Sequence, residues 1–255
     1  MTARLSTGLV NALMFVGSFA DSFANCALDI YSGPQPTLPD NAATGTLLVT
    51  LTNNGGAYTP ETRPVGSITL LTGAAGSVNT LTINGVDILG VAVPFDTSLT
   101  QTAADMVVVI NSNPENRLFV ASSVGAVVTL TGVAGLGDYL NTWAVAATLT
   151  TLTASYVAMA GGVDAVNGLR CGAPTVGVLP KLASQVWSGV AVAAGTAGWF
   201  RLRENIDTGV GATTTGVRYD GAIGTSGAEM NLGSLSIALS APFSITGAAF
   251  TLPQQ

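Results

Sequence analysis

Residues 185–203 read QVWSGVAVAAGTAGWFRLR, and this stretch decides how the chain is interpreted. Two of the three tryptophans, Trp187 and Trp199, flank a run of small residues that includes Gly-Thr-Ala-Gly at 195–198. Bulky apolar residues in short runs, with small residues and glycines between them, are typical of strands joined at a bend. The stretch therefore predicts two apolar strands joined through the bend at 195–198.

Charge is scarce along the whole chain. Charged residues make up 9% of the 255 residues, and hydrophobic residues make up 48%. Disorder requires low hydrophobicity and high net charge, so this composition indicates a folded chain. A soluble monomer normally carries more charge, so we expect much of the surface to pack against neighbouring subunits. The net charge is −6, and the nearest approach to a basic cluster is Arg201 with Arg203, which argues against direct nucleic-acid binding.

The first 25 residues favour an amphipathic helix, with a secretory signal as the alternative. Its apolar face would consist of residues at three- and four-residue steps: Leu5, Leu9, Leu13, Val16 and Ala20. Two uncharged runs, 139–163 and 182–200, are long enough to span a bilayer. Their threonines and glycines favour strands instead, so we expect no membrane contact.

The middle of the chain has a different pattern. Asn84-Gly85 between apolar runs predicts a hairpin within 78–93, and the cluster at 96–98 predicts an N-cap for a helix over 99–112. Further strands are expected at 118–122, 126–131 and 144–153. This order of elements indicates a compact α+β module at residues 66–168.

The segments on either side of the module are rich in strand patterns. They predict strands at 28–31, 46–52, 185–193, 199–203, 218–223, 231–239 and 243–252. We therefore expect a mainly β fold: a discontinuous β-sandwich or jelly-roll-like domain with an N-terminal helix, built from residues 1–65 and 169–255, with the small α+β domain inserted at 66–168. The expected core residues of the outer domain are Trp187, Trp199, Phe200, Tyr31 and Leu48.

Five motifs occur in a fixed order in these outer segments. They are I-Y-S-G-x-Q-P at 30–36, A-A-T-G-T-L-L at 42–48, W-S-G-x-A at 187–191, G-T-A-G-W-F-R at 195–201 and N-L-x-S-x-S-I at 231–237. In this order the chain resembles a family of small structural proteins of tailed-bacteriophage virions, over residues 1–60 and 170–255. The middle region resembles modules inserted into phage tail proteins. The resemblance implies a virion component, assembled in the host bacterial cytoplasm, that contacts capsid or tail subunits and other copies of itself.

The residues of common catalytic sites are missing from the sequence. The chain has no histidine, which excludes Ser-His-Asp and Cys-His catalysis and any histidine-containing metal site. The two cysteines, Cys26 and Cys171, are too few for a zinc site, and both free thiols and a single disulfide remain open. The glycines at 132–137 have the order G-x-x-G-x-G and predict a turn rather than a phosphate-binding loop.

Carboxylates and aromatic residues are the remaining site candidates. Asp87 with Asp96, or Glu204 with Asp207 and Asp220, could bind calcium, but we interpret them as solvated surface groups. The sequence thus predicts no catalytic, metal or cofactor-binding residue and no enzyme activity.

Two aromatic residues of the middle region are candidates for exposed contacts. Tyr139 and Trp143 lie in a polar stretch, whereas Trp187 and Trp199 fit a core better than a sugar platform. Besides a structural role, two functions stay open: binding of a host-surface glycan or protein through the middle module, and polysaccharide cleavage, which the lack of histidine and of a paired-carboxylate motif disfavours.

Overall fold

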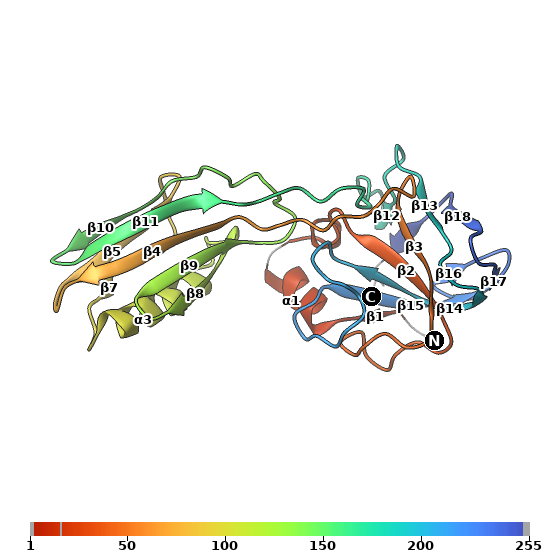
Figure 1. The fold of residues 1–255 in the computed structure, drawn as a ribbon, viewed down its shortest axis with the longest axis horizontal. Helices are drawn as coiled ribbons and strands as arrows, with labels where there is room; N and C mark the ends of the chain where they lie inside the picture. Colours follow the sequence, from red (N-terminus) through yellow and green to blue (C-terminus); the bar gives the residue numbers. More distant parts are fainter. Residues whose placement is uncertain (1–2, 16, 252–255) are drawn as a thin grey trace. The chain divides into compact units, whose positions relative to one another are not determined.

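The computed structural model describes residues 3–15 and 17–251. Strands dominate it, with three helices and nineteen strands in the described ranges, and this confirms the predicted mainly β fold (Figure 1). The chain forms two compact units, Met1–Pro60 with Ala165–Gln255, and Glu61–Asp164. We call the first the outer unit and the second the insert.

The outer unit is built on one large sheet. Its strands lie side by side in the order β1 (Arg4–Leu5), β15 (Arg218–Gly224), β14 (Gly195–Arg203), β2 (Ala27–Ser32), β3 (Leu47–Asn53), β13 (Trp187–Val190) and β18 (Pro242–Ile245). Along this path neighbouring strands are antiparallel. β16 (Met230–Asn231) pairs with β15, β17 (Ser236–Ile237) pairs with β14, and β12 (Val178–Pro180) pairs with β19 (Ala249–Thr251). Strands from the two ends of the chain therefore share one sheet.

The hairpin predicted at 185–203 is wrong, because β2 and β3 lie between β13 and β14. The chain turns at 191–194, where the N–H of Val192 donates to the carbonyl of Leu48 at 2.8 Å. The glycines at 195 and 198 belong to β14 and serve close packing rather than a bend. A Cβ atom on Gly198 would lie 2.1 Å from the carbonyl oxygen of Gly33.

The continuous N-terminal helix predicted over residues 1–25 is also wrong. The segment contains β1, α1 (Thr7–Phe15) and α2 (Phe19–Ser22). α2 begins at a capping box in which Ser18 Oγ accepts the N–H of Asp21 at 3.2 Å and Asp21 Oδ2 accepts the N–H of Ser18 at 3.1 Å.

The predicted apolar face of this segment is only partly buried. Leu9 and Phe19 are buried, Leu13 and Ala20 are half-buried, and Leu5 is exposed, while Val16 lies outside the described residues. Among the residues that the structure describes, no helix is both long and apolar enough to cross a membrane.

The two faces of the outer sheet differ in chemistry because side chains alternate along each strand. On one face, Leu28, Phe200 and Leu202 belong to an apolar core that also includes residues of α1 and α2. On the other face, β14 places Trp199, Arg201 and Arg203, all of which are buried. The sheet therefore separates an apolar layer from a charged one.

The insert contains two antiparallel sheets and one helix. The first sheet has the order β11 (Thr153–Ala160), β4 (Val65–Thr72), β9 (Val127–Gly132) and β8 (Phe119–Val124). The second has the order β10 (Val145–Thr150), β5 (Ser77–Ile83) and β6 (Val86–Asp87), with β7 (Val93–Pro94) also on β5. The predicted helix is confirmed as α3 (Leu99–Ser112), capped by Ser98, whose Oγ accepts the N–H of Gln101.

Local signals in the insert predicted some strands well and others poorly. The turn at Asn84-Gly85 joins β5 to β6, and both residues have positive φ angles of 50° and 84°. The single strand predicted at 144–153 is instead two strands, β10 and β11, which separate at Thr151 (φ 54°) and join different sheets. β4 was not predicted, although its sequence alternates between buried and less buried residues.

Candidate functional site

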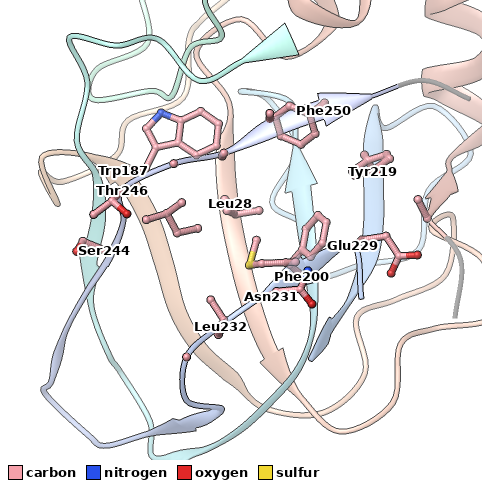
Figure 2. A pocket seen from close by; sticks show the side chains of 17 residues that line it. Leu28, Trp187, Phe200, Tyr219, Glu229, Asn231, Leu232, Ser244, Thr246 and Phe250 are labelled. Carbon is pink, nitrogen blue, oxygen red and sulfur yellow. The ribbon is translucent and has the colours of Figure 1, made fainter. Parts of the chain in front are cut away.

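A cavity of about 520 Å³ opens on the apolar side of the outer sheet. Leu28, Trp187 and Phe200 contribute to its lining from β2, β13 and β14 (Figure 2). Ala3, Tyr219 and the segments 229–233 and 244–250 complete it. The volume falls within the range of small-molecule pockets. The cavity is therefore a candidate binding site.

The polar groups of this cavity offer little chemistry. Glu229 and Asn231 are exposed, and Glu229 Oε2 accepts the N–H of Ala222 at 2.9 Å. Burial, with a smaller effect from the charge of Glu229, raises the pKa of Tyr219. Among the described lining residues there is no basic side chain and no hydrogen-bonded nucleophile and base. The described lining offers apolar side chains beside neutral polar groups and the carboxylate of Glu229.

The opposite side of the sheet carries a buried layer of ion pairs. Arg201 and Asp220 form a bidentate pair, with Nε to Oδ1 at 2.8 Å and Nη2 to Oδ2 at 2.7 Å. Arg203 Nε donates to Asp29 Oδ2 at 2.7 Å, and Arg218 pairs with Asp207. We call these three pairs the ionic layer.

Two loops cover the ionic layer and are held by it. Arg201 Nη2 donates to the carbonyls of Pro39 at 3.1 Å and Asn41 at 3.3 Å, and Arg218 Nη1 donates to the same two carbonyls. Arg201 Nη1 also donates to Gly209 O at 2.8 Å. The loops 33–46 and 204–217 are therefore anchored to the guanidinium groups of Arg201 and Arg218 through backbone carbonyls.

An aromatic pair extends the same layer. The rings of Tyr31 and Trp199 stack with centroids 4.5 Å apart and planes at 10°. Trp199 Nε1 donates to Thr44 O at 3.2 Å, and the guanidinium of Arg201 lies 5.3 Å from the Trp199 ring centroid. This contact of the ring with a cation and a loop carbonyl gives Trp199 a structural role.

The interpretation of Glu204, Asp207 and Asp220 as solvated surface carboxylates is wrong. Asp220 is fully buried, and Glu204 is buried as well. Burial raises the pKa of Asp220 despite its pairing with Arg201. Burial acts in the same direction on Asp207, but hydrogen bonds from Arg218 and the N–H of Gly209 outweigh it and lower the pKa. Each acid is committed to a protein partner, and no group of metal-binding residues is found in the described ranges.

The other two acids considered for calcium are also bound to backbone groups. Asp87 Oδ1 accepts the N–H groups of Leu81 and Leu89, both at 3.1 Å, and Asp96 Oδ1 accepts the N–H of Thr97 at 2.6 Å. They shape the turns around β6 and the start of α3.

The ionic layer and its loops cover only one half of this side of the sheet. On the other half, Ser188 of β13 pairs with Thr52 of β3 and with Ser244 of β18, and Val190 pairs with Pro242. A shallow hollow of about 350 Å³ lies here. It is lined by Asn54, Gly55, Ser188, Gly189, Val190, Pro242, Phe243 and Ser244. We call this half, made of β3, β13 and β18, the open face.

The structure places the residues singled out in the sequence as follows. Trp187, Trp199, Phe200, Tyr31 and Leu48 are all buried. In the insert, Tyr139 is 63% exposed and Trp143 is half-buried against the core, with their ring centroids 5.4 Å apart. The five predicted core residues thus belong to the outer unit, and Tyr139 and Trp143 belong to the insert.

Both cysteines are free thiols in the structure. Cys26 is fully buried, and burial raises the pKa of its thiol well above the ordinary value. Cys171 is half-buried, and burial raises its pKa to about 11. Reactive cysteines have lowered pKa values, so neither thiol has the character of a nucleophile.

In the glycine-rich segment 132–137, Gly132 ends β9 and the residues after it form turns, as predicted. The segment also has a role that the sequence did not reveal. Its N–H groups hold an anion that belongs to the chain itself. Glu61 Oε1 accepts the N–H of Gly135 at 2.7 Å, and Oε2 accepts that of Gly137 at 3.3 Å. Successive backbone N–H groups form such anion-binding concavities. No spacing rule links Glu61 to glycines more than seventy residues away.

The chain was compared with models of protein families, with curated proteins and with solved structures, and none of the three comparisons found a match.

Proposed function

We propose that the protein is a structural component of a tailed-bacteriophage virion and acts by packing against other subunits of a symmetric assembly. The observation that carries the proposal is where its few charges lie. Seven of the twenty-two charged residues are buried, and six of these seven belong to the outer unit. They are Asp29, Glu61, Arg201, Arg203, Glu204, Arg218 and Asp220.

Burying these charges leaves a surface that is easy to desolvate. Many large hydrophobic side chains are exposed on both units, among them Leu38, Val124 and Val190. Interfaces are depleted of charged residues at their centres, because removing charges from water is costly. A weakly charged surface on a rigid, well-anchored sheet is therefore suited to subunit packing. The five ordered motifs, through which the chain resembles small structural proteins of tailed-bacteriophage virions, support the same proposal.

Particles of the phage that encodes this chain provide the test. We expect purified virions to contain the chain in a fixed number of copies, measured by quantitative mass spectrometry. On the order of hundreds of copies would indicate a capsid protein, and about a dozen or fewer would indicate the tail, neck or baseplate. Purified particles that lack the chain would refute the proposal.

Binding of a host-surface ligand through the insert is a second candidate, favoured by the exposed ring of Tyr139 beside Trp143. Particles carrying a chain without the insert distinguish the two roles. If they assemble but no longer adsorb to cells, the insert binds the host. If they fail to assemble, the insert contributes to subunit packing.

A further inference from the structure

Three asparagines of the chain are followed directly by glycine, at Asn54-Gly55, Asn84-Gly85 and Asn167-Gly168. In such a pair the backbone nitrogen of the glycine can attack the side-chain amide carbon of the asparagine, because glycine has no Cβ atom to hinder the approach. The attack requires an asparagine side chain that is free to turn and a glycine N–H that is not held by an acceptor. The three pairs differ in both respects.

The pair Asn84-Gly85 meets both requirements. The two residues form the turn between β5 and β6, and both are exposed. Within the described residues, neither the side chain of Asn84 nor the N–H of Gly85 makes a hydrogen bond. A Cβ atom on Gly85 would meet no atom within 4 Å. The amide of Asn84 is therefore open to water and free to turn toward the nitrogen of Gly85.

The pair Asn167-Gly168 meets neither requirement. Asn167 Nδ2 is the nitrogen that the reaction must release, and it donates to Ala57 O at 2.8 Å. The carbonyl of Asn167 accepts the N–H of Asn53 at 2.8 Å. Gly168 is buried, and a Cβ atom on it would lie 2.5 Å from the Cα atom of Asn25. Turning the Asn167 side chain toward the next nitrogen therefore breaks contacts that the fold supplies.

The pair Asn54-Gly55 lies between these two cases. Both residues are exposed, as in the turn of the insert. However, the N–H of Gly55 donates to Thr52 O at 3.5 Å, and the N–H of Asn54 donates to Val186 O at 2.7 Å. The attacking nitrogen is thus weakly held while the side chain is exposed.

We propose that Asn84 is a site of spontaneous deamidation and that the fold sets the order of reactivity as Asn84, Asn54, Asn167. The nitrogen of Gly85 loses its proton to hydroxide and bonds to Cγ of Asn84, and the bond from Cγ to Nδ2 breaks so that ammonia leaves. One water molecule then opens the resulting succinimide at either carbonyl, which gives aspartate or isoaspartate. The overall change is hydrolysis of one amide by one water molecule, without oxidation or reduction.

The products change the insert at the hairpin of β5 and β6. Both place a new negative charge in the turn, and isoaspartate also adds one carbon to the backbone of a two-residue turn. In this hairpin Thr82 lies opposite Asp87, and the N–H of Ile88 donates to Leu81 O at 2.8 Å. We expect hydrogen exchange at these positions to quicken in the isoaspartate form. The proposal is independent of the proposed function, since it requires only the folded insert and water.

Peptide mass spectrometry of the purified full-length chain tests the proposal. The folded chain is incubated in water enriched in heavy oxygen, and samples are digested at intervals. The peptide with Asn84 should be the first to gain the mass of an amide-to-acid conversion, with one solvent oxygen incorporated. The peptide with Asn167 should react at least about tenfold more slowly, because its amide is hydrogen-bonded and the next residue is buried. The rate at Asn84 should rise about tenfold per pH unit above neutrality, because the attacking nitrogen must lose its proton.

Two controls separate the effect of the fold from that of the sequence. In urea, where the chain is unfolded, all three pairs should react at similar rates. The variant Asn84→Gly removes the reactive amide and keeps a residue that accepts the positive φ of the turn, so the insert should fold and this peptide should stay unchanged.

Each contrary result has a definite meaning. The proposal is overturned if Asn54 or Asn167 reacts as fast as Asn84 in the folded chain, or if Asn167 reacts equally fast in the folded chain and in urea. It is also overturned if Asn84 reacts in urea but not in the folded chain, or if its mass gain brings no solvent oxygen.

Discussion

Asp220→Asn tests whether the ionic layer stabilises the folded outer unit. The substitution keeps the shape of the side chain but removes the negative charge that faces Arg201, which is fully buried and cannot turn to water. It also points an amide toward a guanidinium that has only donors. Removing one partner of a buried ion pair costs about 3–5 kcal/mol. The outer unit should therefore lose about 3–5 kcal/mol of unfolding free energy, with a fall in melting temperature on the order of 10 °C.

Urea unfolding followed by tryptophan fluorescence measures this loss. A Trp143→Phe background removes the one tryptophan of the insert, so that Trp187 and Trp199 report on the outer unit alone. Glu229→Gln is the control, because this carboxylate lies in the same unit but is exposed. Its effect should stay within about 0.5 kcal/mol.

The double variant Arg201→Met with Asp220→Leu separates charge from packing. It removes both charges, so it should be no less stable than Asp220→Asn alone, even though several loop carbonyls lose their donor. If Asp220→Asn costs less than about 1 kcal/mol, or if the double variant costs the sum of its single changes, the charge of this pair does not stabilise the fold in the way described.

The remaining predictions concern the thiols and the insert. Cys26 should react with a thiol reagent only after unfolding, and Cys171 slowly; fast reaction of both in the native chain would contradict their burial. Because the pKa of Cys171 is raised to about 11 in the folded chain, its contribution to stability is lost as the pH rises toward 11, and Cys171→Ser should flatten that decline in thermal melts. Glu61→Ala should cost about 1.5–3 kcal/mol and speed hydrogen exchange of the glycine segment that it holds; unchanged exchange would refute the contact. Replacing residues 60–165 with Asn-Gly should leave a folded outer unit by circular dichroism, because Thr59 and Val166 already pair as a hairpin would; an unfolded product would contradict its independence.

The sequence correctly predicted those elements that neighbouring residues determine. The helix over 99–112 follows from its N-cap and its spacing, and the turn at Asn84-Gly85 follows from the positive φ angles that these residues tolerate. The break before α2 also has a local cause, the capping box at Ser18, but the apolar periodicity of the segment hid it.

The candidate sites were less predictable, because they depend on distant partners. Asp220 looks like a surface acid until β15 is aligned with β14, which sets it opposite Arg201. Arg203 and Asp29 are separated by 174 positions in the chain, and Glu61 lies far from the glycines that hold it. Neither spacing nor composition connects such residues.

The sequence by itself determined the mainly β class, the change of pattern in the middle region and the scarcity of charge, since composition and period-two alternation are properties of short segments. The tertiary structure alone decided that the strands of the stretch 185–203 do not pair with each other and that β2 and β3 separate them. It also decided which face of the sheet carries the ion pairs. The register between distant strands places Arg201 beside Asp220 and Asp29, so that their side chains lie on the same face. Trp187 and Trp199 are therefore buried on opposite faces of the sheet, Trp187 at the apolar cavity and Trp199 against Tyr31 beside the ionic layer.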